Sequence, residues 1–372
     1  LYVSPRMRLP LWRGSFLELT SDLRHEDLRV DEGVPPSADY SGDSRRGRTS
    51  LGAGAQLEQF LADRMLQLVA GVRVDLLDNR FGVPEGEGEF DEQGEDTRTF
   101  AATPRMGLRA NLADGISLRL SAGRYFRAPT LIELFGDQGY IQGREDLVPE
   151  SGGNLDLGFA LDRPLGRRPA PWKLFATTAA FGSFTENLIT WVQAGPVVRP
   201  VNLEGASVIG IEAGGQLTAP RRWVIAQSNY TFMESVNLSQ IGSQHDQPLP
   251  GRPRHQLFGR VSVGREFGAP KWEPRVFYGV DYISSSYLDP SGRMSLPPRH
   301  FHNTGVELHV LGRIDLAVEV RNLLDQRQVS WQPPIAGEGP VPTAIVDYIG
   351  YPLPGRSVWA SLRVRMCLHC ER

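Results

Sequence analysis

The 372-residue sequence has no long apolar run, very little lysine and almost no cysteine. No window approaches the ~20 consecutive apolar residues of a transmembrane helix, which argues against a helical membrane protein. Lysine occurs only at Lys173 and Lys271, and the net charge of −3 gives no basic field for nucleic acid. The two cysteines, Cys367 and Cys370, lie at the extreme end, so no disulfide framework holds the body of the chain together.

What the sequence has instead is glycine, proline and a repeated two-residue alternation. Gly 40 and Pro 28 favour strands and turns over helices, and no linker separates two differently patterned halves. Apolar and polar residues alternate in stretches such as 66–76, 116–122 and 314–320. A strand collects each set on one face, whereas a helix scatters it. We therefore expect the apolar face of each strand to meet lipid on the convex side of a sheet and the polar face to line its concave side.

This alternation assigns named residues to the two faces. The convex set comprises Leu66, Leu68, Val72, Val74, Ile116, Leu118, Leu120, Ile314, Leu316, Val318 and Val320. The concave set comprises Arg73, Asp75, Arg119, Asp315, Glu319 and Arg321. A register error of one residue in any strand would exchange its two sets.

The alternation predicts about 14 strands, joined by long and short connections in turn. The strands are expected near 14–30, 50–62, 65–78, 100–111, 116–128, 151–161, 172–193, 200–219, 221–236, 253–266, 274–289, 297–311, 314–330 and 354–366. The long connections are 31–49, 79–99, 129–150, 237–252 and 331–350. Short turns on one side and long loops on the other are typical of outer-membrane β-barrels, and they place the C-terminus on the short-turn side. Since no amphipathic helices are available to cover the apolar face, lipid is its simplest cover.

Several short elements follow one another in a distinctive order. The first are Arg127-Ala-Pro129-Thr, Glu133-Leu134-Phe135 and Asp146-Leu-Val-Pro149-Glu150. The later ones are FGSFTENLI at 181–189, Asn202 with Gly205 and Ala206, Gly210-Ile-Glu212, PGRPRH at 250–255, Val320-Arg-Asn322-Leu-Leu-Asp325 and Tyr351-Pro-Leu-Pro354-Gly355-Arg356. In this order they resemble the β-barrel of TonB-dependent outer-membrane receptors, which import scarce nutrients such as iron chelates and cobalamin.

The resemblance implies an all-β fold, an antiparallel transmembrane β-barrel meander. Receptors of this family have 22 strands, an N-terminal plug domain and a short box that engages TonB. Only about 14 strands are expected here, and the plug and box are absent, so we expect a truncated barrel over residues 1–366 followed by a tail at 367–372. The start at Leu1, without an initiator Met or signal peptide, favours the same interpretation. Met366 stands where the family usually ends on an aromatic residue, which weakens the expected signal for the barrel-assembly machinery.

The resemblance also implies a function, a location and partners. It predicts a receptor in the outer membrane of a Gram-negative bacterium for TonB-energised uptake, with a ferric siderophore favoured as ligand and cobalamin as an alternative. The implied partners are that ligand, outer-membrane lipid, the barrel-assembly machinery and TonB, the last through the missing N-terminal region. Because transport in the family needs the plug, the chain by itself is expected to have no active uptake. A passive 14-strand channel is the alternative.

Most motif residues have structural uses that need no ligand. Pro129 and Pro149 end strands without leaving an N–H to pair, and Arg127 and Glu150 flank one long loop and are placed to pair across its neck. Structural roles are likewise expected for Glu133, Leu134, Phe135, Asn202, Gly210, Glu212, Asn322, Asp325, Pro354, Gly355 and Arg356. For ligand contact the candidates are Phe135, Tyr140 and Arg144 in the loop 129–150, because they combine flat apolar surface with a guanidinium fork suited to anionic chelates.

Metal sites and enzyme chemistry have weaker signals. The acidic segment 85–96 offers oxygen ligands of the kind Ca²⁺ prefers, but its spacing matches no defined calcium loop. Cys367-x-His369-Cys370 supplies half a zinc site, and His300 and His302 share one strand face. Neither pair is expected to bind metal. No Gly-x-Ser-x-Gly, metalloprotease or phosphate-loop motif occurs, so the protein is not expected to be an enzyme and needs no cofactor.

Overall fold

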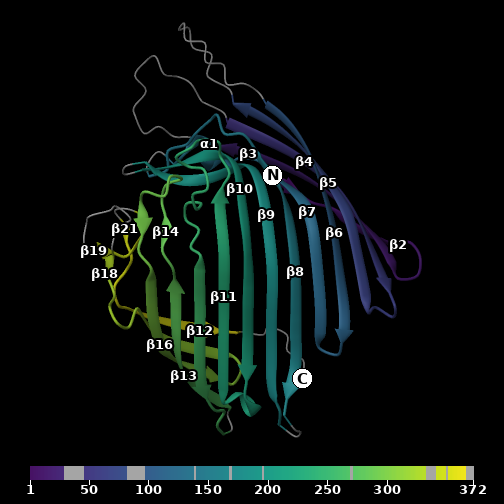
Figure 1. The fold of residues 1–372 in the computed structure, drawn as a ribbon. Helices are drawn as coiled ribbons and strands as arrows, with labels where there is room; N and C mark the ends of the chain where they lie inside the picture. Colours follow the sequence, from purple (N-terminus) through teal and green to yellow (C-terminus); the bar gives the residue numbers. More distant parts are fainter. Residues whose placement is uncertain are drawn as a thin grey trace.

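The computed structural model describes residues 1–28, 46–81, 97–137, 140–166, 170–194, 197–268, 271–331, 341–348 and 351–365. Most of them form one antiparallel sheet of 16 strands, in which strands that follow each other in the sequence pair side by side (Figure 1). Its main strands are β3 (Ser15–Leu28), β4 (Arg46–Leu61), β5 (Leu66–Phe81), β6 (Thr97–Ala113), β7 (Ile116–Arg127), β8 (Glu150–Leu165), β9 (Trp172–Ala194), β10 (Val197–Thr218), β11 (Val224–Asn237), β12 (His255–Gly264), β13 (Trp272–Ile283), β16 (Arg299–Val310), β17 (Ile314–Arg321) and β22 (Ser357–Val364). The two remaining strands, β1 (Tyr2–Val3) and β2 (Arg6–Pro10), both pair with β3.

All 14 predicted strands are present in the main sheet, and the two short N-terminal strands of that sheet were not predicted. Two predicted strands extended too far. β13 ends at Ile283, and β17 ends at Arg321 because Asn322 adopts a left-handed backbone conformation with φ 49 that interrupts the strand. The long connections also contain small hairpins that the sequence did not predict, namely β14 (Ser286–Tyr287) with β15 (Ser295–Leu296), β18 (Gln328–Trp331) with β19 (Val341–Ala344), and β20 (Val346–Tyr348) with β21 (Tyr351–Pro352).

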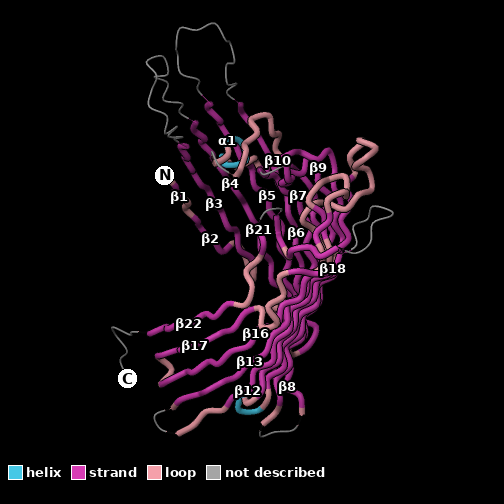
Figure 2. Tube along the Cα trace, turned by 90° about the vertical axis from the view of Figure 1, so that its left-hand side faces the viewer, coloured by secondary structure: helices cyan, strands magenta, loops and turns pink. Residues whose placement is uncertain are grey.

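The sheet curves into a wall that does not close (Figure 2). Within the described residues, no hydrogen-bonded pair joins β22 at one edge to β1, β2 or β3 at the other. The expected curved and open meander is thereby confirmed. β22 ends opposite the start of β17, where Val364 pairs with Ile314. Because β17 starts directly after the tight turn that follows β16, the described chain ends on the short-turn side, as predicted.

Two short helices lie at opposite ends of the wall. The helix α1 (Leu131–Phe135) lies among the long connections, and the 3₁₀ turn η1 (Pro220–Arg222) links β10 to β11 among the short turns. One connection on the long-loop side is short, since β9 ends at Ala194 and β10 begins at Val197. Within the described residues, no helix has the length and apolar character needed to cross a membrane.

The position of α1 identifies the two faces of the sheet. Figures 1 and 2 place α1 inside the curve, and Arg127 of β7 pairs with Glu133 of α1, so Arg127 points to the concave side. Arg119 is an even number of residues from Arg127 on β7, so it also points to the concave side, while Leu118 and Leu120 face the convex side. Cross-strand pairing carries this assignment through every neighbouring strand. Both predicted sets, convex and concave, lie on the predicted faces.

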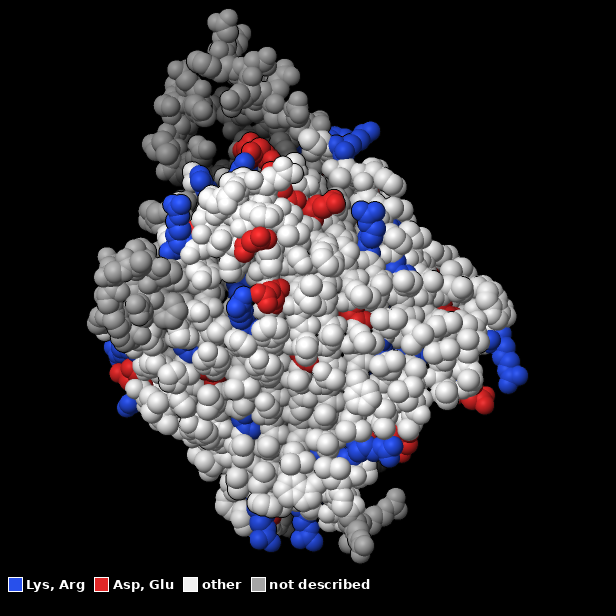
Figure 3. Space-filling model, in the orientation of Figure 1, with Lys and Arg blue, Asp and Glu red and all other residues white. Residues whose placement is uncertain are grey.

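The convex face has the layout of a membrane-facing surface. Few charged side chains interrupt its central area (Figure 3). Aromatic and imidazole rings lie at both margins: Trp172, Trp223, Phe267 and Trp272 at the short-turn end, and Tyr230, His255, Tyr278, Tyr282, His300 and His302 towards the long loops. On β13, Trp272 and Tyr282 are ten residues apart, which spans about 33 Å along a strand and about 25 Å across a membrane at the usual strand tilt. That matches the apolar band of an outer-membrane barrel.

Candidate functional site

The loop after β7 begins with a short capped helix that the sequence analysis did not predict. Thr130 caps α1: its hydroxyl accepts a hydrogen bond from the Glu133 backbone N–H at 3.3 Å. The Glu133 carboxylate in turn accepts one from the Thr130 backbone N–H at 2.7 Å. The signal was present as Thr-x-x-Glu, the pattern of a capping box. This helix start buries Glu133 to 5% exposure and directs its carboxylate towards β7.

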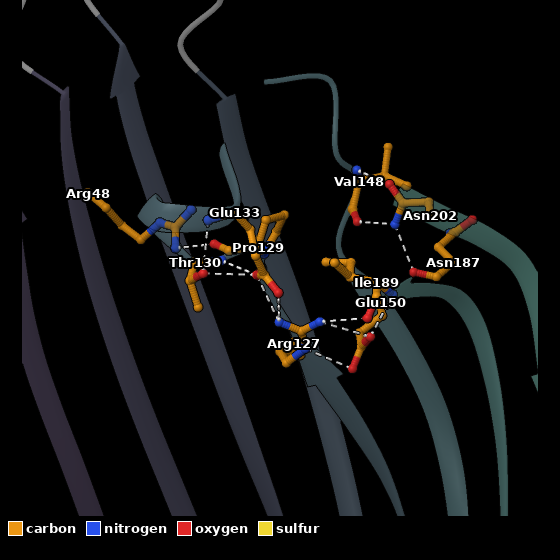
Figure 4. A network of polar contacts seen from close by, with 10 residues as sticks. All are labelled: Arg48, Arg127, Pro129, Thr130, Glu133, Val148, Glu150, Asn187, Ile189 and Asn202. Carbon is orange, nitrogen blue, oxygen red and sulfur yellow. Dashed lines mark hydrogen bonds and ion pairs between the residues drawn. The ribbon is translucent and has the colours of Figure 1, made fainter. Parts of the chain in front are cut away.

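Arg127 at the end of β7 connects two buried carboxylates (Figure 4). Its Nη1 lies 3.0 Å from Glu133 Oε2, and its Nε lies 2.9 Å from Glu150 Oε1. Glu150, which is 6% exposed, also accepts a hydrogen bond from the Ile189 backbone N–H at 2.9 Å. The predicted pairing of Arg127 with Glu150 is therefore present. The second partner, Glu133, was not predicted.

Two further side chains extend this network across the wall (Figure 4). Arg48 of β4 donates to the Pro129 carbonyl at 2.6 Å and to Asn79 at 2.6 Å. Asn202 of β10 donates to the carbonyls of Val148 and Asn187 and accepts from the Val148 N–H. We call Arg48, Arg127, Glu133, Glu150 and Asn202 the loop clamp, because together they tie the loop 128–149 to β4, β7, β9 and β10.

The three predicted ligand-contact residues lie on the loop that this clamp holds. Phe135 packs against a core formed by Leu134, Leu147 and Ile189. The Tyr140 carbonyl accepts a hydrogen bond from the Val198 N–H on β10. Arg144 pairs with Asp146, Nε to Oδ1 at 2.5 Å, and this pairing raises the pKa of the Arg144 guanidinium and lowers that of the Asp146 carboxyl. Phe135 thus packs within the loop, while Arg144 is charged and half-exposed.

Gly210 and Phe181, which come from two separate sequence motifs, meet on the concave face. They are cross-strand partners on β10 and β9, and a Cβ on Gly210 would overlap the Phe181 ring and the Phe232 carbonyl oxygen. Glycine is therefore needed where the ring lies over the neighbouring strand. Glu212, two residues along β10, is an exposed carboxylate on the same concave face.

The last two motifs fasten the end of β17 to the start of β22. Asn322 donates to the carbonyls of Gln326 and Pro354. Asp325 accepts from the Arg356 N–H at 2.7 Å and from Arg327 Nε at 3.0 Å. A Cβ on Gly355 would overlap the Asp325 and Arg327 side chains. The structural role expected for these motif residues has a concrete form here, which we call the β17–β22 staple.

A cavity of about 500 Å³ opens at the long-loop end of the wall. Its lining includes Trp191, Arg252, Gln256, Ser286 and Arg299. Gln256 pairs across strands with Ile283, and Ile283 pairs with Arg299, which places all three on the concave face. Residues 250–255 were identified as a motif, but the cavity was not predicted, because its lining comes from segments far apart in the chain.

The lining of the cavity includes one cation that has no partner among the described residues and one indole ring. Arg299 forms an ion pair with Asp347. The exposed guanidinium of Arg252 has no hydrogen bond or ion pair with any described residue. Trp191 is half-buried on β9 and lines the same space. A guanidinium and an indole that line one cavity suit an anionic ligand with flat or apolar parts.

Only one of the weaker metal candidates, the pair His300 and His302, lies within the described residues. The acidic segment 85–96 and the pair Cys367 and Cys370 with His369 lie outside the described residues. His302 shares a hydrogen bond with the Tyr278 hydroxyl, and its ring lies 5.5 Å from that of His300 on the convex face. No group of three or more His, Cys, Asp or Glu in the described part of the chain is arranged to hold a metal ion.

Comparison with known proteins decides the family. A family model described as "TonB dependent receptor-like, beta-barrel" matches residues 6–323. The chain belongs to this family. The TonB-dependent receptor barrel accounts for the ordered motifs, the antiparallel strand order and the apolar convex face described above. No curated protein matches the chain.

Solved structures of other family members share the fold at low sequence identity. The copper transporter OprC is 16% identical with a TM-score of 0.69, and the match covers 98% of this chain and 56% of that one. A mutant of the ferric enterobactin receptor PfeA from Pseudomonas aeruginosa is 18% identical with a TM-score of 0.64, covering 98% and 53%. The ferric yersiniabactin uptake receptor FyuA from Yersinia pestis is 16% identical with a TM-score of 0.63, again covering 98% and 53%. The chain spans about half the length of these proteins.

Proposed function

We propose that this protein serves in the Gram-negative outer membrane as the barrel of a receptor for TonB-energised uptake of a metal chelate, with a ferric siderophore as the ligand. Membership of the family supports the transport class. Proteins of similar fold include receptors for ferric enterobactin and ferric yersiniabactin and a copper transporter. Cobalamin is the alternative ligand. TonB, the barrel-assembly machinery and outer-membrane lipid are the proposed partners.

The observation that carries the ligand proposal is the cavity lined by Trp191 and Arg252. Its volume of about 500 Å³ falls in the range of sites for small organic ligands. Ferric siderophores combine negative charge with flat chelating groups, which a guanidinium and an indole bind well. The loop held by the loop clamp supplies a second contact surface, on which Tyr140 and Arg144 are the proposed rim contacts.

The test is chelate binding to outer membranes that contain the protein. Trp191→Ala and Arg252→Gln are expected to weaken binding of ferric enterobactin, ferric yersiniabactin or another ferric siderophore by roughly tenfold each. Arg254→Gln is the matched control, because Arg254 pairs with Glu234 and does not line the cavity. Tyr140→Ala with Arg144→Ala tests the rim in the same assay. Unchanged affinity in both cavity variants would remove the cavity from the binding site. Binding of cyanocobalamin, with no ferric siderophore bound, would replace the siderophore with cobalamin.

A further inference from the structure

A groove of about 430 Å³ crosses β6, β7, β8 and β9. Its floor is made of the small residues Ala122, Gly153 and Gly182, which leave the backbone uncovered. Met106 and Phe184 rise beside it with 64% and 59% exposure. Cross-strand pairing places all of these residues on the convex face, on the same side as Leu120 and Leu155. The groove is therefore separate from the cavity on the concave face.

Arg124 borders this groove and is an outward-facing cation with no partner in the described part of the chain. It pairs across strands with Gly153 of the groove floor. The exposed guanidinium makes no hydrogen bond or ion pair with any described residue. Glu186 lies on the same face, two residues beyond Phe184, and it forms no ion pair with Arg124. The positive charge beside the groove is thus not neutralised by any described residue.

The depth of Arg124 places it at the level of lipid head groups. It lies eight residues beyond Ile116, the first residue of β7 at the short-turn end. Eight residues span about 26 Å along a strand and about 20 Å across the membrane at the usual tilt. The apolar band of a barrel is about 25 Å tall, and an arginine near its edge extends its guanidinium outwards to the interface.

We propose that the groove and Arg124 form a site for a phosphate-bearing membrane lipid of the leaflet on the long-loop side. One acyl chain lies over Ala122, Gly153 and Gly182, between Met106 and Phe184. It supplies the dispersion contacts that an empty groove lacks. The lipid phosphate accepts charge-assisted hydrogen bonds from the Arg124 fork. A lipid is the occupant because only a lipid presents an acyl chain and an anionic group at this depth on the convex face.

The test is lipid binding followed by native mass spectrometry of the protein extracted from membranes. The probes are phosphatidylglycerol, diacylglycerol, which has the chains without the phosphate, and inorganic phosphate. Gly182→Leu fills the groove, since a Cβ there meets nothing within 4 Å. Gly259→Leu is its control, because Gly259 is an equally open position on the convex face of β12, away from the groove. Arg119→Gln on the opposite face of β7 is the control for Arg124→Gln.

The proposal expects phosphatidylglycerol to bind the unaltered protein and both control variants equally. Arg124→Gln and Gly182→Leu should each weaken that binding by roughly tenfold. Diacylglycerol should bind weakly to the unaltered protein, and Arg124→Gln should leave that binding unchanged. Equal phosphatidylglycerol binding in all variants would overturn the proposal. So would competition by inorganic phosphate alone, which indicates a free-anion site, or a dimer lost in Gly182→Leu, which indicates a second copy of the chain. None of these outcomes depends on the siderophore proposal.

Discussion

Arg127 and Glu150 close the neck of the loop between β7 and β8, with Nε 2.9 Å from Oε1. Both residues come from the ordered motifs, and Arg127 also pairs with the buried Glu133 of α1. The motif therefore encodes a rigid support for the loop that carries Phe135, Tyr140 and Arg144. A support of this kind holds binding residues in place without touching the ligand.

Removing the cation of the loop clamp should release this loop. Arg127→Met leaves two buried carboxylates without their partner, which should lower the free energy needed to open the loop by about 3 kcal/mol. Amide hydrogen exchange within 131–147, including the Arg144 N–H that donates to the Glu133 carbonyl, should accelerate roughly a hundredfold. Arg144→Gln breaks only an exposed pair and should change exchange less than tenfold. Slow exchange in Arg127→Met would show that the clamp does not hold the loop.

The two faces of β7 should respond in opposite ways to arginine. Leu120 points to the convex side, where arginine in the middle of the apolar band costs about 2–4 kcal/mol. Its neighbour Ser121 points to the concave side and donates to Asp156 at 3.1 Å, so Ser121→Arg places a cation near a carboxylate. The fraction of chain assembled in the outer membrane should fall for Leu120→Arg and stay near normal for Ser121→Arg. Equal assembly of the two variants would contradict the assignment of faces.

Gly210 should tolerate no side chain, in contrast to other glycines of the sheet. Gly210→Leu forces the Phe181 ring away from β10 and should reduce the assembled fraction severalfold, because overpacking costs about 1–3 kcal/mol. Gly259→Leu is the control, since nothing lies within 4 Å of a Cβ there. A double variant with Phe181→Ala should recover part of the loss. Without such recovery, the contact between the two motifs would not explain the need for glycine.

The β17–β22 staple should weaken in acid. The Arg356 backbone N–H and the Arg327 guanidinium hold the pKa of Asp325 below its ordinary value. Because the folded-state pKa is the lower one, this contribution is complete above about pH 4 and is lost as the pH falls through the lowered pKa. The protection factor of the Arg356 amide, its intrinsic exchange rate at each pH divided by its observed rate, should therefore fall below pH 4 in the unaltered protein. In Asp325→Asn the protection factor should be lower and free of this titration, and a titration that persists there would assign the effect to another group.

The strands were predictable because the alternation of apolar and polar residues lies within each strand's own sequence. The loop clamp was not predictable, since its partners are far apart in the sequence. Each strand from β3 to β22 in the main sheet shows its two-residue period within its own sequence. The number of strands and the face to which each side chain points could therefore be predicted without tertiary information. The edge strand β2 is five residues long and ends in Pro10, which gives a weak strand signal. Arg48 bonds the Pro129 carbonyl across 81 positions of sequence, and no local pattern indicates that contact.

One part of the candidate binding site was likewise predictable from the local sequence, and another part was not. The Thr130-x-x-Glu133 capping box was visible locally and would have predicted α1 within the loop. The cavity was not visible, since Trp191, Arg252 and Arg299 come from three separate segments that only the fold brings together. Arg144 was predicted from its charge, but its pairing with Asp146 shows that it is less free than Arg252 to bind an anion.

The central claim, reception of a ferric siderophore for TonB-energised uptake, is tested most directly by iron accumulation. The measurement follows radioactive iron supplied as a panel of ferric siderophores to cells whose only receptor for the chelate carries this chain. The account predicts saturable accumulation that requires functional TonB and falls with Trp191→Ala and Arg252→Gln, while binding to the cell surface persists without TonB. Entry of iron chelates and small sugars alike, unsaturable and independent of TonB, would contradict the account and identify a passive channel.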